Sequence, residues 1–187
     1  MYLSICNIEK AIWRQPTSRA MVLIGYIPVC KLECFSDKNQ SVEGYQLFHE
    51  CMHTLLKPLI KAGMQGVDMP CADGFIRWVF LILSAYIADY LEQCLVTCCR
   101  ENACPQCQVP VKKWGEHIHS VLHDPQEMLQ TLAEKSHGEN PKEFVSQNLW
   151  LINPFWKDLP HCDIFSSMTP DFLHQLHKGI IKDHIVS

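Results

Sequence analysis

The fold is decided by the stretch FIRWVFLILSAYIADYLEQCLVTCCRENACPQC, residues 75–107. An apolar run, residues 78–88, leads into a single carboxylate, Asp89, and a cysteine pair follows at Cys104 and Cys107. The aromatic and β-branched residues of the run favour a buried strand that ends at Asp89, although periodicity alone leaves a buried helix open. The run is too short to cross a bilayer, which takes about 20 residues.

Asp89 has two equally weighted interpretations. A carboxylate at the end of a buried strand is costly unless it is paired or bound to a metal, and α/β folds place working groups at strand ends. Asp89 could instead cap the short helix expected over residues 91–99. Asp73 is different, because it precedes Gly74 between two apolar stretches, which favours a hairpin turn over a catalytic role.

The sequence Cys104-Pro-Gln-Cys107 is the sharpest local signal. Two thiolates three positions apart can bind one tetrahedral Zn²⁺ from a tight turn. The pair supplies two of the four ligands that a structural zinc site needs. The nearby donors that could complete the set are Cys98 and Cys99, and the distant ones are His174 and His177, whose spacing puts both imidazoles on one face of a helix. The alternatives are a turn with two free thiols and a helix with two surface histidines.

The first half of the chain mixes strands with one long helix. Residues 1–8 and 20–30 are expected to be strands. Apolar residues recur at helical spacing over residues 41–62, which predicts a helix that ends at Gly63 and in which Pro58 produces a kink or splits off the last turn.

The second half is expected to be mainly helical. Residues 124–135 open with an aspartate and a proline, which predicts a well-capped helix. Residues 141–147 form a helical turn or two, and residues 153–169, rich in proline and aromatics, predict an irregular packed segment. Residues 170–184 predict a final helix. The fold class is therefore α/β.

Composition limits the function classes. The chain has 187 residues, 48% of them hydrophobic, enough for a real core, and its net charge is −4. A free-standing DNA-binding module is usually basic. If DNA is the substrate, we therefore expect other parts of the protein to provide most of the DNA contacts. The basic residues that could touch a DNA backbone are scattered: Lys10, Arg14, Arg19, Lys31, Lys112 and Lys113.

The cysteine count indicates the compartment. Eleven cysteines is an odd number, and the first residues lack the charged and apolar regions of a secretory signal. We therefore expect a reducing compartment, nuclear or cytoplasmic, and no membrane association. A zinc deaminase is excluded because no His-x-Glu precedes the cysteine pair, and no glycine-rich phosphate loop is present.

Three blocks of the sequence resemble the Plavaka transposases of basidiomycete fungi, relatives of the CACTA/EnSpm cut-and-paste elements. The blocks are LECFSDKNQSVEGYQLFHECM, then CADGF with AYIADYLEQCLVTCCRENACPQC, and finally NPFWKDLPHCDIFSSMTPDFLHQLHKGIIKDH. They are long and collinear, and the resemblance extends from Tyr2 to Ser187.

The resemblance implies an RNase H-like core with a helical insertion, in which three acids hold two Mg²⁺ ions for phosphodiester cleavage and strand transfer on DNA. The family's second acid, in an Asp-aromatic context, maps onto Asp89, and its cysteine pair maps onto Cys104 and Cys107. A downstream Asp-x-x-His feature maps onto Asp171 and His174. Residues 1–100 would then be a partial RNase H-like core, and residues 101–187 a zinc-knuckle turn with a helical insertion.

Departures from the family pattern bear on activity. Leu91 stands where a proline is expected, and the family's first and third acids fall before Met1 and after Ser187. One carboxylate cannot fix a two-metal site, so we expect a transposase fragment without autonomous strand cleavage. The alternative is a zinc-stabilised interaction module that pairs with full-length transposase, for example as an inhibitor.

Overall fold

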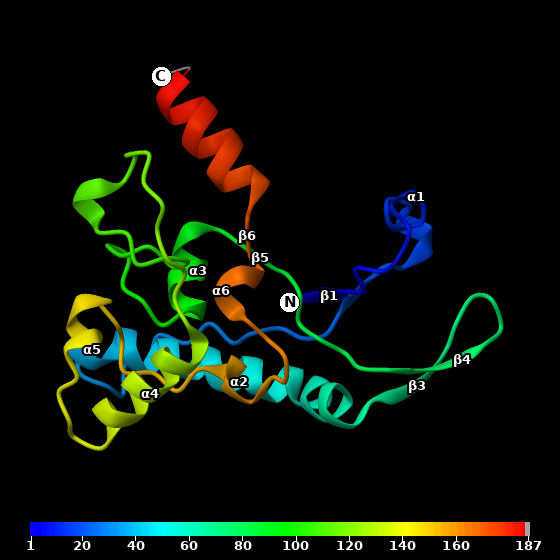
Figure 1. Cartoon of the computed structure of the whole chain (residues 1–187), viewed down its shortest axis with the longest axis horizontal. Coiled ribbons are helices and arrows are strands. Elements are labelled where there is room, and N and C mark those ends of the chain that lie inside the picture. The colour runs from blue at the N-terminus through cyan, green and yellow to red at the C-terminus, as the bar shows by residue number, and fades with distance from the viewer. Residues whose placement is uncertain (186–187) are drawn as a thin grey trace.

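The computed structural model describes residues 1–185, without the side chains of residues 175–176, 179–180 and 183–185. Figure 1 shows the long helix α2 running across the lower part of the molecule, with α3 and the C-terminal helix above it. The helices are α1 (Lys10–Trp13), α2 (Asp37–Gln65), α3 (Tyr90–Val96), α4 (Pro125–Ser136), α5 (Lys142–Ser146), α6 (Ile164–Ser167) and the π-type helix η4 (Phe172–Ile185), with 3₁₀ turns η1 (Pro16–Ser18), η2 (Val111–Lys113) and η3 (Phe155–Asp158).

The strands of the described chain form three separate pairs rather than one sheet. The antiparallel pairs join β1 (Tyr2–Ser4) to β2 (Met21–Leu23) and β3 (Val67–Pro70) to β4 (Ile76–Val79). The parallel pair joins β5 (Tyr86–Ala88) to β6 (Met168–Pro170), with Ala88 opposite Pro170. The α/β class is confirmed, as small sheets with several helices.

The predicted strands are longer than the observed ones. Residues 1–8 and 20–30 contribute only the short strands β1 and β2, and the apolar run 78–88 splits into the end of β4 and β5. The hairpin turn is confirmed, because the Asp73 carboxylate accepts a hydrogen bond from the Phe75 N–H at 3.2 Å. It also pairs with the Arg77 guanidinium, which donates from Nη1 at 2.8 Å and from Nη2 at 2.5 Å.

Helix α2 is longer than its apolar pattern indicated. It begins at Asp37 and runs through Pro58 to Gln65, so the prediction that Pro58 could split off the last turn is wrong. Gly63 does not end the helix but lets it pack closely, because a Cβ there would lie 2.5 Å from Pro160 Cγ and 2.7 Å from the Leu81 carbonyl oxygen. The helix ends at Gly66, whose φ of 72° suits glycine.

The predictions for the second half are closer to the structure. Asp124 caps α4, accepting hydrogen bonds from the backbone N–H groups of Gln126 and Glu127. The segment 153–169 is largely irregular, with the short elements η3 and α6 holding buried aromatic rings. The final helix is present, although its hydrogen bonding is of the π type.

One hydrophobic core joins both halves of the chain. Met52 of α2 and Val96 of α3 are fully buried in the same cluster as Met128 of α4. The Trp156 indole N–H donates to the Val96 carbonyl at 2.8 Å, which fixes η3 on α3. Within residues 1–185, no helix combines the length and apolar character needed to cross a membrane.

A buried histidine links three segments of this core. The ring of His49, on α2, is 1% exposed. Its Nδ1 accepts the Phe155 N–H at 3.1 Å, so Nε2 carries the proton and donates to the Leu95 carbonyl at 2.9 Å. Burial outweighs the Leu95 hydrogen bond and lowers the pKa of His49 from 6.5 to about 4.

We predict that His49 makes stability depend on pH. Because its pKa is lower in the folded state, the unfolded chain binds the extra proton between about pH 4 and 6.5. This contribution to stability is present above pH 6.5 and decreases as the pH falls to 4, by up to about 3 kcal/mol. The free energy of unfolding, measured with urea from pH 4 to 7.5, should change less with pH in His49→Gln than in the parent. An equal pH dependence of the two proteins would contradict the assignment.

Candidate functional site

The parallel pair β5–β6 brings two carboxylates to one edge. Asp89 and Asp171 are the residues that directly follow the two strands. The Asp171 N–H donates to the Ala88 carbonyl at 3.0 Å, so the hydrogen-bonded ladder continues to the point where the acids begin. In α/β proteins, ligands bind outside the carboxyl ends of parallel strands, and this edge is such a place.

A buried amide holds the two strand ends together. The Gln93 side chain, 4% exposed, reaches back from α3. Its Nε2 donates to the Ala88 carbonyl of β5 at 2.9 Å and lies 3.5 Å from the Thr169 carbonyl of β6. Gln93 therefore bridges the strands next to the acids.

Asp89 also caps a helix. Its Oδ1 accepts the Glu92 N–H at 2.8 Å at the start of α3. No hydrogen bond among residues 1–185 engages Oδ2, which leaves that oxygen for another ligand. The Glu92 side chain accepts a hydrogen bond from the Tyr86 hydroxyl at 2.7 Å. Burial, together with Glu92, raises the pKa of Tyr86, so its hydroxyl keeps its proton.

Asp171 forms a pair with His174. Asp171 Oδ1 accepts the Leu173 N–H at 2.8 Å, and Oδ2 contacts His174 Nδ1. The hydrogen bond from His174 is the main cause that lowers the pKa of Asp171. The His174 side chain is 49% exposed, so the pair lies at the surface beside the strand edge.

The cysteine turn has the geometry of half a zinc site. Cys104 and Cys107 place their Sγ atoms 3.3 Å apart. Two thiolates on one tetrahedral Zn²⁺ lie about 3.8 Å apart, given a Zn–S distance of about 2.3 Å, so a small opening of the turn accommodates the ion. His123 packs against this turn with Nε2 3.1 Å from the Cys104 carbonyl, and its buried Nδ1 has no hydrogen-bond partner among the described residues.

The two thiols differ in acidity. Burial raises the pKa of Cys104. Burial also opposes ionisation of Cys107, but interactions with the Ser120 hydroxyl, the Val109 backbone and Cys104 outweigh it and lower the pKa of Cys107. All eleven cysteines are free thiols.

The cysteine turn is tied to both strands of the acidic edge. Gln106, between the two cysteines, donates from Nε2 to the Met168 carbonyl of β6 at 2.9 Å. Tyr90, the residue after Asp89, donates from its hydroxyl toward the Ala103 carbonyl at 3.1 Å. The turn and the acids are therefore parts of one assembly.

The two histidines of the candidate zinc set lie elsewhere. His174 contacts Asp171, and the His177 ring packs against Phe172 with centroids 5.0 Å apart. In the part of the chain that the structure describes, no three His, Cys, Asp or Glu side chains gather closely enough to hold a metal ion. The cysteine pair is thus brought together without these histidines.

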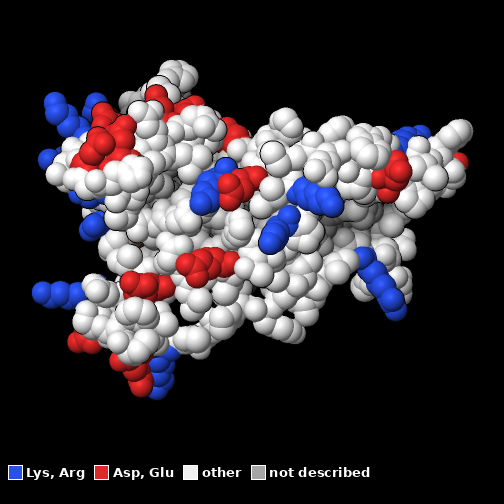
Figure 2. Space-filling model, turned by 90° about the horizontal axis from the view of Figure 1, so that it is seen from below, with Lys and Arg blue, Asp and Glu red and all other residues white. Residues whose placement is uncertain are grey.

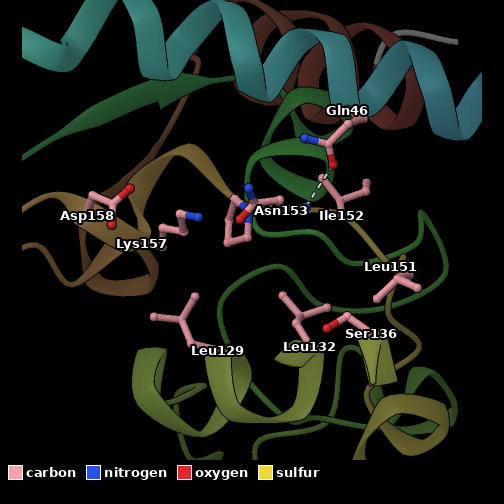
Figure 3. Close-up of a pocket in the computed structure, with 10 residues that line it drawn as sticks. Gln46, Leu129, Leu132, Ser136, Leu151, Ile152, Asn153, Lys157 and Asp158 are labelled. Carbon is pink, nitrogen blue, oxygen red and sulfur yellow. Dashed lines mark hydrogen bonds between the residues drawn. The ribbon is translucent and has the colours of Figure 1, made fainter. Parts of the chain in front are cut away.

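A pocket of about 600 Å³ lies apart from the acidic edge, between α2, α4 and the segment 151–158 (Figure 3). Its walls combine leucines of α4 with polar groups, and Gln46 Oε1 accepts the Asn153 N–H at 2.9 Å at its rim. Its titratable side chains are Lys157 and Asp158, and Asp158 pairs with His53 at 3.3 Å. Neither Asp89 and Asp171 nor Cys104 and Cys107 line this pocket.

The fold and site define a mixed α/β protein with a carboxylate-bearing edge of parallel strands braced by a cysteine turn. The family model described as Plavaka transposase matches residues 1–187, the whole chain, and the chain belongs to this family. Comparison with curated proteins and with solved structures gave no match.

Sequence patterns did not single out the residues that connect this site. Gln93, Gln106 and Tyr90 carry the contacts between the strands and the cysteine turn. The available signals were weak: a glutamine four residues after Asp89 on the buried face of a short helix, and a glutamine inside the cysteine turn. Amide side chains have no motif of their own, because their role depends on which backbone carbonyls fold next to them.

We predict that two substitutions separate capping by Asp89 from its charge. Asp89→Ala removes the acceptor for the Glu92 N–H and should lower the free energy of unfolding by about 1 kcal/mol. Asn caps helices as well as Asp does, so Asp89→Asn should stay within a few tenths of a kcal/mol of the parent. Urea unfolding at pH 7 measures both. Equal losses in the two variants would contradict a capping role.

Proposed function

We propose that this chain is part of the catalytic region of a cut-and-paste DNA transposase with an RNase H-like core, and that Asp89 is one of its metal-binding acids. The observation that carries the proposal is the parallel pairing of β5 with β6, which sets Asp89 and Asp171 side by side in a chain of the Plavaka family. Residues 1–100 would carry the core, and residues 101–187 the insertion.

The arrangement suits phosphodiester chemistry. Asp89 caps α3 through one oxygen, and no hydrogen bond among the described residues engages the other. Carboxylate oxygens are the ligands that Mg²⁺ prefers. Bound Mg²⁺ would supply activation of a water or a DNA 3′-hydroxyl and stabilisation of the leaving oxygen. The Asp171–His174 pair lies on the neighbouring strand end.

A structural zinc ion at Cys104 and Cys107 is the second part of the proposal. Its support is the short Sγ–Sγ distance and the anchoring of the turn to β6 through Gln106. The ion would stiffen the turn and, through these contacts, the acidic edge. His174 and His177 remain its proposed partners, and they would have to move toward the cysteines from their present contacts.

The charge distribution fits a chain that does not provide most of the contacts with DNA. Figure 2 shows acidic and basic side chains interspersed on one face, without a continuous basic surface. This agrees with the net charge of −4.

We predict that Asp89→Asn weakens Mn²⁺ binding at least about tenfold, because even outer-shell changes at metal sites cost about 10- to 100-fold. Asn preserves the helix cap, so the fold is kept. Isothermal titration of the full chain with Mn²⁺, a substitute for Mg²⁺, measures the effect. Asp73→Asn is the matched control, since it removes the same charge from a surface turn. Equal Mn²⁺ affinity of the parent and Asp89→Asn would reject Asp89 as a metal ligand.

The zinc proposal has a spectroscopic test. Co²⁺ substitutes for Zn²⁺ and absorbs in the near ultraviolet when bound by thiolates. We predict that the parent shows this absorption and that Cys104→Ser and Cys107→Ser each lose most of it, because the pair supplies the thiolates. Cys34→Ser, at an exposed thiol, should leave it unchanged. Full absorption in Cys104→Ser would place the metal elsewhere.

A further inference from the structure

A hairpin-like arm, residues 108–121, extends from the cysteine turn. Its base is closed by a hydrogen bond from the Gln108 N–H to the Val121 carbonyl at 3.0 Å. The isolated bridge between Cys107 and Leu122 and a hydrogen bond from the His123 N–H to the Gln106 carbonyl at 3.0 Å extend this pairing. The base of the arm is therefore closed by backbone pairing.

The tip of the arm carries two adjacent cations. Lys112 and Lys113 lie in the turn η2 and are exposed. Neither forms an ion pair with a described residue. Glu116 is the arm's single carboxylate, so the tip has a net positive charge in a protein that is acidic overall. Two unpaired lysines on a short loop suit contacts with phosphates.

An aromatic contact directs this tip toward the acidic edge. The ring of Trp114 lies edge-on to the ring of Tyr90, with centroids 6.3 Å apart and an interplanar angle of 85°. Tyr90 directly follows Asp89. The Trp114 side chain remains 43% exposed, which leaves part of its ring for stacking on a base. In Figure 1 the arm rises above α3, on the side away from α2.

We propose that the arm is a DNA-binding element, in which Lys112 and Lys113 contact backbone phosphates while Trp114 keeps the strand beside Asp89. The inference rests on the proposed function and adds to it the residues that bind DNA. Lysines next to an exposed tryptophan are the combination that binds nucleic acid without sequence preference. An acidic protein partner would use the lysines but gain nothing from the neighbouring carboxylate edge.

The test is the salt dependence of DNA binding by the full chain. Fluorescence anisotropy with a labelled 30-base DNA single strand, from 50 to 200 mM KCl, gives the slope of log affinity against log salt. Each phosphate contact on a single strand contributes about 0.7 to that slope. Lys112→Ala/Lys113→Ala should therefore reduce the slope by about 1.4, so the rise in salt should cost the variant roughly sevenfold less affinity than it costs the parent.

The control is Lys57→Ala/Lys61→Ala, which removes the same charge from exposed positions on α2. It should leave the slope unchanged. Trp114→Ala should weaken binding without changing the slope. The proposal is overturned if the two lysine variants behave alike or if the parent does not bind DNA. The Mn²⁺ titration of Asp89→Asn involves no DNA, so failure of the arm and failure of the metal-binding edge are distinguishable.

Discussion

The parallel pairing of β5 with β6 is the constraint on which the site depends. The two strands are about 80 residues apart in sequence, and between them lie α3, the cysteine turn, the arm, α4 and α5. Closing so long a loop costs conformational entropy, although the cost grows slowly with length. The Ala88 carbonyl offsets part of it by accepting from both the Asp171 N–H and Gln93. Without this pairing, Asp89 and Asp171 would have no reason to be neighbours.

The intervening chain is built to keep the pairing. Trp156 and His49 fix η3 to α3 and α2, so the segment that leads into β6 is anchored in the core. Gln106 then ties the cysteine turn to β6 next to the acids. The result is a continuous path of hydrogen bonds from the core to the cysteine turn that passes the acidic edge. A metal in the turn would act on the acids through this path.

The sequence predicted the features that depend on near neighbours. The Asp124 cap and the Asp73 turn follow from side chains that bond backbone groups two or three residues away, and α2 follows from its apolar spacing. The limits of α2 were missed, because Gly63 serves packing against Pro160 rather than termination.

Features that depend on distant partners could not be predicted in the same way. The strands are only about three residues long because few of their backbone groups hydrogen-bond to another strand. The content of β-branched residues does not predict where such pairing occurs. Its position in the sequence favoured neither interpretation of Asp89, as a helix cap or as a catalytic carboxylate. The structure shows the cap directly, through Oδ1, and no hydrogen bond among the described residues engages the other oxygen. That Asp89 is also a metal-binding acid is our proposal.

The most direct test of this account is nuclear magnetic resonance on the pairing itself. The account predicts that the Asp171 amide proton, bonded to the Ala88 carbonyl at 3.0 Å, exchanges slowly with solvent, and that cross-strand nuclear Overhauser effects connect Ile87 with Thr169. Rapid exchange at Asp171 together with absent cross-strand effects would show that the acids do not share an edge, and would contradict the central claim.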